Sequence, residues 1–89
     1  MEWSIELTPK ADRQLNRLDQ QTVRRVNRFI FQRITFLEDP RSIGEALKGT
    51  EFGDLWKYRV GDYRIIASIE DNLVQILVVR IGNRREVYR

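Results

Sequence analysis

The chain has 89 residues, of which 42% are hydrophobic and 33% charged, a globular composition with room for one domain, residues 1–89. It has no cysteine and no histidine, which excludes disulfides, Cys/His zinc sites, thiol nucleophiles and imidazole general bases. The missing cysteines, and the lack of a signal or an apolar run of membrane-spanning length, lead us to expect a cytoplasmic protein with no membrane partner.

The net charge of +3 comes entirely from the last part of the chain. Residues 1–54 contain nine basic and nine acidic residues, whereas residues 55–89 contain seven basic and four acidic ones. Such an asymmetry indicates a polyanionic partner.

The first elements predicted are a strand and a short helix. Residues 2–7 alternate between polar and apolar side chains, which is typical of a half-buried strand. Thr8 and Pro9 then supply a hydroxyl at the N-cap and a proline at the first helical position, so we expect a helix that ends at about Leu18.

A second helix is predicted over residues 20–37, with Asp19 as its N-cap and Pro40 just beyond its end. Its apolar stripe consists of Val23, Val26, Ile30, Ile34 and Leu37. The basic residues of the opposite side, which we interpret as a solvated face, are Arg24, Arg25 and Arg28. Phe29 and Phe36 lie off the stripe, and either pack against the first helix or form a docking surface for a partner.

Three strands follow a loop in the C-terminal half. Residues 41–54 have three glycines and no period, which predicts a loop. Residues 55–60, 63–69 and 73–81 are predicted strands, the first two joined by a tight turn at Gly61-Asp62. The chain is therefore α+β, with a strand and a two-helix hairpin packed on an antiparallel sheet that ends in a three-stranded meander.

Strand alternation divides the aromatic residues of this sheet from its cations. Trp56, Tyr58 and Tyr63 fall on the helix-covered face, where we expect them to form core rather than stack on bases. The cations expected on the open face are Lys57, Arg59, Arg64 and Arg80. That face is either a solvated basic surface or an anion-binding site, and its acidic neighbours are few, Asp62 in the turn and Glu86 in the tail.

Residues 82–89 form a basic tail. Gly82 permits a chain reversal that would return Arg84 and Tyr88 to the open face, although a frayed end is the alternative. A tyrosine beside arginines can stack on a base or exchange a proton, and arginines bind phosphate through their forked geometry.

The chemistry that remains is cationic. No carboxylate cluster suggests a metal, and the glycines have no phosphate-loop spacing, so we expect neither a metal nor a cofactor. A site of lysine, arginine and tyrosine suits cleavage of RNA phosphodiesters, and it suits plain nucleic-acid binding equally well.

Three segments of the sequence resemble the RelE/ParE superfamily of bacterial and archaeal toxins, nearest the RelE branch. They read Leu-Lys-Gly at 47–49, Leu-Trp-Lys-Tyr-Arg-Val-Gly-Asp-Tyr-Arg-Ile-Ile at 55–66 and Ile-Gly-Asn-Arg-Arg-Glu-Val-Tyr at 81–88. The resemblance implies a small toxin of a type II toxin–antitoxin pair, with an α/β fold related to microbial ribonucleases. It also implies entry into the ribosomal A site, cleavage of mRNA without a metal, and a cognate protein antitoxin that holds the toxin inactive in a hetero-oligomer.

The resemblance also implies roles for four residues. Lys57 matches a catalytic lysine, Arg64 an arginine that holds the scissile phosphate, and Arg84 a second arginine that stabilises the transition state. Tyr88 matches a C-terminal tyrosine that orients the substrate by stacking. Further contacts to RNA are expected from Arg59, Arg80, Arg85 and Arg89.

The sequence departs from the pattern at two positions. RelE toxins carry a second lysine where this chain has Leu55, and many relatives carry a histidine where it has Asn83. Two alternatives therefore stay open: a ParE-like poison of DNA gyrase on the same fold, and a non-catalytic RNA-binding module.

Overall fold

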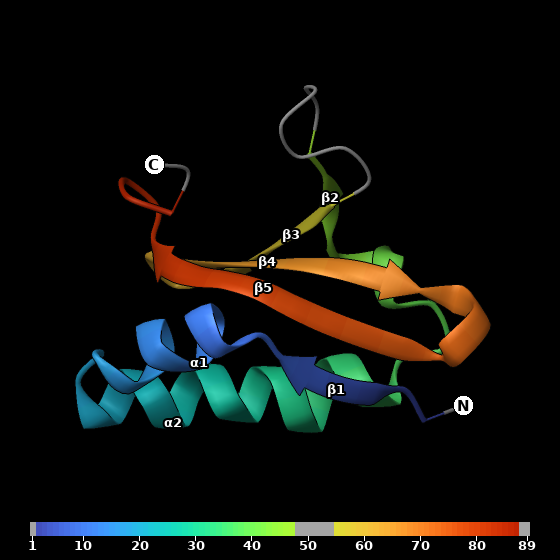
Figure 1. The fold of residues 1–89 in the computed structure, drawn as a ribbon, viewed down its shortest axis with the longest axis horizontal. Coiled ribbons are helices and arrows are strands. Elements are labelled where there is room, and N and C mark those ends of the chain that lie inside the picture. Colours follow the sequence, from blue (N-terminus) through green and yellow to red (C-terminus); the bar gives the residue numbers. More distant parts are fainter. Residues whose placement is uncertain (1, 48–54, 88–89) are drawn as a thin grey trace.

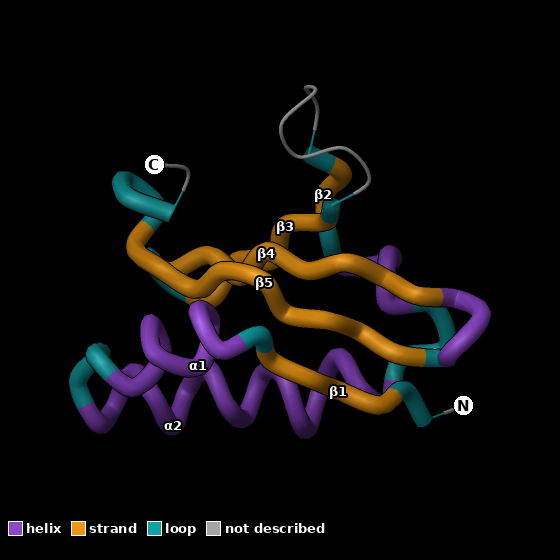
Figure 2. Tube along the Cα trace, in the orientation of Figure 1, coloured by secondary structure: helices purple, strands orange, loops and turns teal. Residues whose placement is uncertain are grey.

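The predicted helices and strands occur in the expected order in a computed structural model that describes residues 2–47 and 55–87. The N-terminal elements are β1 (Ser4–Leu7), α1 (Pro9–Asn16) and α2 (Gln20–Arg28). The meander consists of β3 (Trp56–Val60), β4 (Tyr63–Glu70) and β5 (Gln75–Asn83). The α+β class is confirmed, with both helices on one face of the sheet (Figures 1 and 2).

Both helices begin where their capping residues predict. The Thr8 hydroxyl accepts a hydrogen bond from the Ala11 N–H at 3.2 Å. A carboxylate oxygen of Asp19 accepts one from the Thr22 N–H at 3.0 Å. These bonds satisfy amide donors that the first turn of a helix leaves without partners.

The second helical segment continues beyond α2, but its last turns are not α-helical. A π-helical turn, Phe29–Arg33, and a 3₁₀ turn, Ile34–Phe36, carry the segment to about the predicted end. The stripe residues Val26, Ile30 and Ile34 are four apart, and each such step overshoots an α-helical turn by about 40°. The wider π turn absorbs this overshoot, so that all three side chains are at most 1% exposed.

The sheet has five strands in the order β1-β5-β4-β3-β2. β1 joins as an edge strand parallel to β5, a direction that its alternation does not specify. The predicted loop over residues 41–54 is wrong at its start, because Pro40–Ile43 forms a 3₁₀ turn and β2 (Glu45–Ala46) pairs antiparallel with β3. A two-residue strand is too short to show a period.

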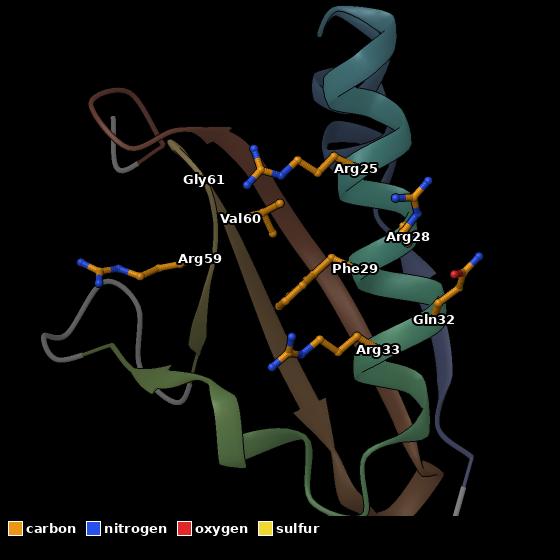
Figure 3. Close-up of a pocket in the computed structure, with 8 residues that line it drawn as sticks. All are labelled: Arg25, Arg28, Phe29, Gln32, Arg33, Arg59, Val60 and Gly61. Atoms are coloured by element: carbon orange, nitrogen blue, oxygen red, sulfur yellow. The ribbon is translucent and has the colours of Figure 1, made fainter.

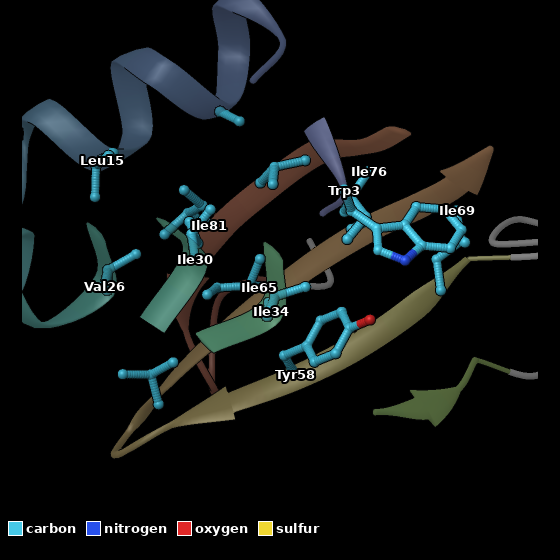
Figure 4. Close-up of a cluster of buried hydrophobic side chains, with 14 residues drawn as sticks. Trp3, Leu15, Val26, Ile30, Ile34, Tyr58, Ile65, Ile69, Ile76 and Ile81 are labelled. Carbon is cyan, nitrogen blue, oxygen red and sulfur yellow. The ribbon is translucent and has the colours of Figure 1, made fainter. Parts of the chain in front are cut away.

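The core lies between the helices and the sheet, where Ile30, Ile65 and Ile76 are fully buried (Figure 4). Tyr58 is also fully buried, as predicted, and its hydroxyl donates a hydrogen bond to the Pro40 carbonyl at 2.5 Å. In the described part of the chain no helix is long and apolar enough to cross a membrane.

The two phenylalanines off the stripe have different environments. Phe29 packs edge-on against Tyr58 of β3, with ring centroids 6.1 Å apart, rather than against α1. Phe36 is 61% exposed, so the expectation that it packs against the first helix is wrong.

Candidate nucleic-acid interface

Cross-strand register brings four cations into two adjacent rows on the sheet face opposite the helices. In one row Ile66 of β4 lies between Lys57 of β3 and Arg80 of β5. In the next row Arg64 of β4 pairs with Arg59 of β3. Residues directly opposite each other share a face, and adjacent strands are about 4.8 Å apart. The register therefore gathers cations of three strands on one face.

Lys57 has a carboxylate partner that the sequence analysis missed. Its Nζ lies 3.3 Å from Oε2 of Glu45, with the lysine side chain 22% exposed and the glutamate side chain 60%. Glu45 reaches this position because β2 pairs Glu45 directly with Lys57. The sequence could have indicated this ion pair only through the strand at residues 45–46, which is too short to show a period.

Arg64 is buried, at 8% exposure, although its parity places it on the face expected to be open. Its Nη1 donates hydrogen bonds to the carbonyl oxygens of Gly61 (3.0 Å) and Tyr63 (2.9 Å). The guanidinium group therefore secures the β3–β4 hairpin, and it has a fixed position. Ile66 beside it is fully buried, so the central part of this face is covered rather than open.

The tail folds back on the end of β5 as predicted, but the chain turns after Asn83 rather than at Gly82, which is still paired with Arg64 in β5 (Figure 1). The Arg84 N–H donates to the Asp62 carbonyl at 2.8 Å, which fixes the start of the tail beside the hairpin turn. Val87 is 4% exposed, and its carbonyl accepts a hydrogen bond from Arg80 Nη1 at 3.3 Å. Arg84 and Arg85 are exposed, whereas Tyr88 and Arg89 lie outside the described residues.

The titration of Tyr58 removes it from the possible acid–base groups. Burial raises the pKa of its phenol to about 12, so the hydroxyl stays protonated near neutral pH. Over residues 2–47 and 55–87, His, Cys, Asp and Glu form no group of three or more that could hold a metal ion. The cationic rows and the folded tail are therefore the features with which this face can contact a polyanion.

Residues 5–88 match the protein family described as ParE toxin of type II toxin–antitoxin system, parDE. The chain is 26% identical over 89 residues to Toxin RelG of Mycobacterium tuberculosis, an alignment that covers 100% of this chain and 99% of the relative. It is 29% identical over 87 residues to Toxin RelE of the same organism, covering 98% of this chain and 87% of the relative.

Solved toxin–antitoxin complexes have the same fold. The RelBE2 complex of Mycobacterium tuberculosis contains a chain that superposes with a TM-score of 0.85 at 23% identity, covering 97% of this chain and 95% of that one. A chain of the archaeal RelE–RelB complex of Pyrococcus horikoshii gives a TM-score of 0.76 at 25% identity, covering 98% and 100%.

Proposed function

Since the chain belongs to the ParE toxin family of type II toxin–antitoxin systems, we propose that it inhibits translation by cutting mRNA in the ribosomal A site. The observation that carries the proposal is the pair of cationic rows on β3–β5, beside which Arg84 begins the tail. A phosphodiester that becomes more negative during cleavage is stabilised by cations held in fixed positions.

The reaction is an attack of the ribose 2′-oxygen on the adjacent phosphorus. The O2′–P bond forms, the P–O5′ bond breaks, the 2′-hydroxyl gives up its proton and the departing 5′-oxygen gains one. We assign Lys57 to the first step of the reaction, in which it supports loss of the 2′ proton. Arg64 and Arg84 stabilise the charge on the phosphate oxygens, and Tyr88 stacks on a base to orient the strand.

The burial of Arg64 supports its role. Two carbonyl oxygens of the hairpin hold its Nη1, so little reorganisation is needed when charge develops nearby. The further arginines, Arg59, Arg80, Arg85 and Arg89, bind the RNA on either side of the cut.

A cognate protein antitoxin completes the proposal. The solved structures with the same fold include complexes with RelB antitoxins. We propose that such an antitoxin covers the cationic face, neutralises it and keeps the toxin from the ribosome as part of a hetero-oligomer.

The test is a brief induction of the chain in bacteria, followed by mapping of mRNA 5′ ends and by assay of DNA supercoiling. Cuts in phase with codons on translated messages, absent with Lys57→Ala, support the proposal. The family description favours one other candidate, a poison of DNA gyrase, which would produce gyrase-linked DNA breaks instead. If neither codon-phased cuts nor gyrase-linked breaks are found, the remaining candidate is a non-catalytic RNA-binding module.

A further inference from the structure

A second cationic site lies on the helix side of the β3–β4 hairpin. It is a groove of about 470 Å³, which we call the arginine groove. The residues that define it are Arg25, Arg28 and Arg33 from the second helical segment, Arg59 from β3, and Phe29 and Val60 between them (Figure 3). The sequence analysis treated Arg25 and Arg28 only as parts of a solvated helix face.

Among the described residues, no ion pair compensates the charge of Arg25, Arg28 and Arg33 in the arginine groove. None of its lining residues is acidic. Across residues 2–47 and 55–87, the ion pairs use Arg41 and Lys57, and none uses Arg25, Arg33 or Arg59. Like charges gathered around one hollow repel each other, and a bound anion relieves that repulsion.

The π-helical turn gives the groove its shape. Arg25, Phe29 and Arg33 extend from the helical segment toward the hairpin in Figure 3. The Arg33 guanidinium carbon lies 5.9 Å from the centroid of the Phe29 ring, a distance at which the cation is attracted to the ring face. The turn that keeps Ile30 in the core therefore also places the Phe29 ring and the Arg33 side chain in the groove, beside Arg25 of α2.

Gly61 allows Arg25 to close the hairpin end of the groove. A Cβ atom at position 61 would lie 2.8 Å from Nη1 of Arg25, closer than real contacts allow. The guanidinium group therefore rests directly on the turn, which only glycine leaves open. Arg25 is exposed, so its guanidinium group lies beside the hairpin with its forked edge available for a ligand.

We propose that the arginine groove binds the phosphate backbone of an RNA strand, as a second contact separate from the cleavage face. Arg59 borders the groove through its position in β3, but its side chain extends away from the helix, toward the side of the cationic rows (Figure 3), so that one strand can pass around β3 from one site to the other. The biological use of the contact rests on the proposed ribonuclease function. RNA is favoured over an acidic peptide because the apolar side chains of the groove are poor anchors: Val60 is only 6% exposed, and the Phe29 ring already contacts Tyr58 and Arg33.

The experiment compares Arg25→Gln/Arg33→Gln with a matched control, Lys10→Gln/Arg13→Gln, which removes the same charge from exposed positions of α1. Both pairs are made in the Lys57→Ala background, so that the RNA stays intact. Binding is measured with a short fluorescein-labelled single-stranded RNA and, separately, with ribosomes that carry no mRNA, each over a range of salt concentrations. The two probes distinguish messenger from ribosomal RNA as the source of the phosphates.

The groove variant should bind at least one probe roughly tenfold or more weakly than the control, and its salt slope should be smaller by about 1.4, the value for two lost contacts to a single strand. Equal affinities and slopes for both pairs would overturn the proposal while leaving the cleavage test unaffected. Loss of antitoxin binding with RNA binding intact would make the groove a protein docking site and would also overturn it. If mapping finds no mRNA cuts and the variant still loses RNA affinity, only the ribonuclease proposal fails.

Discussion

Lys57 carries most of the functional proposal, and a neighbouring carboxylate forms an ion pair with it. Because Glu45 lies 3.3 Å from its Nζ, the pair is locally neutral, and the glutamate would repel an incoming phosphate. Under the proposed function, RNA has to compete with Glu45 for the lysine. This competition is a property of the folded sheet, since the two residues are twelve positions apart in the sequence.

Replacing Glu45 should make the lysine more available. We expect Glu45→Gln to tighten RNA binding and to speed single-turnover cleavage on programmed ribosomes, whereas Lys57→Ala should lose on the order of 10²-fold or more in rate. Glu38→Gln, which removes an exposed charge elsewhere, is the control. A Glu45→Gln variant slower than wild type would show that the carboxylate takes part in the reaction.

Tyr58 provides a prediction about stability and pH. Its phenol has a pKa of about 12 in the folded state against an ordinary value of 10.0, so the unfolded chain releases this proton first as the pH rises. The stabilisation linked to the protonated phenol is fully present below pH 10. Between about pH 10 and pH 12 the free energy of unfolding should therefore fall by about 3 kcal/mol.

The comparison variant is Tyr58→Phe. At neutral pH its free energy of unfolding should be about 1–3 kcal/mol lower than that of the wild type, because the Pro40 carbonyl is left without its donor. Urea unfolding of both proteins from pH 7 to pH 12 makes the measurement. The difference in unfolding free energy between them should shrink over the alkaline range. A constant difference would show that the phenol ionises in both states alike.

At the scale of elements, the β3–β4 hairpin joins the two cationic sites. Gly61 has a φ of +60° at the first position of the turn, which is the arrangement of a type II′ turn. Arg64 donates a hydrogen bond to the Gly61 carbonyl from one face of the hairpin, and the guanidinium group of Arg25 lies against Gly61 from the other face. A change at Gly61 therefore acts on stability and on the arginine groove together.

Two substitutions at Gly61 should separate these effects. Gly61→Ala should destabilise the fold by about 1–2 kcal/mol, because a residue with a Cβ atom is strained at this φ. Gly61→Asn should recover part of that loss, since asparagine tolerates the left-handed region. Both variants displace Arg25, so both should weaken RNA binding, and thermal unfolding combined with RNA titration checks the two effects. RNA binding equal to wild type in both would mean that the position of Arg25 is unimportant.

At the scale of the whole molecule, the cationic sites proposed for RNA are separate from the exposed apolar side chains. The cationic rows and the arginine groove lie around the β3–β4 hairpin. Exposed apolar side chains lie elsewhere, with Phe31 and Phe36 on the second helical segment and Leu73 at the β4–β5 turn. Exposed aromatic residues are common at protein interfaces, so an antitoxin can hold the helices while it covers the cations.

An antitoxin prediction follows at this scale. The chain expressed alone should arrest growth, and co-expression with an adjacent open reading frame should restore growth and yield a complex that copurifies. Phe36→Ser should weaken that complex. The control is Leu73→Ser, which removes a similarly exposed apolar side chain at the β4–β5 turn, away from the helices. A chain that proves harmless without any partner would contradict this prediction, as would an adjacent frame that gives no rescue.

The sequence alone determined the order of elements, the helix starts, the alternation of core and polar side chains along β3, and membership of the toxin family. These properties are local, because capping bonds and alternation depend on residues close together in the chain. Thr8, Asp19 and the burial of Tyr58 could all be predicted for this reason.

Tertiary structure alone decided which of the predicted cations are exposed and what each one contacts. The burial of Arg64 depends on the hairpin carbonyls, the pairing of Lys57 with Glu45 depends on a two-residue strand, and the arginine groove depends on a π-helical turn facing β3. Each of these requires segments distant in sequence to be placed side by side, and neither periodicity nor composition specifies that placement.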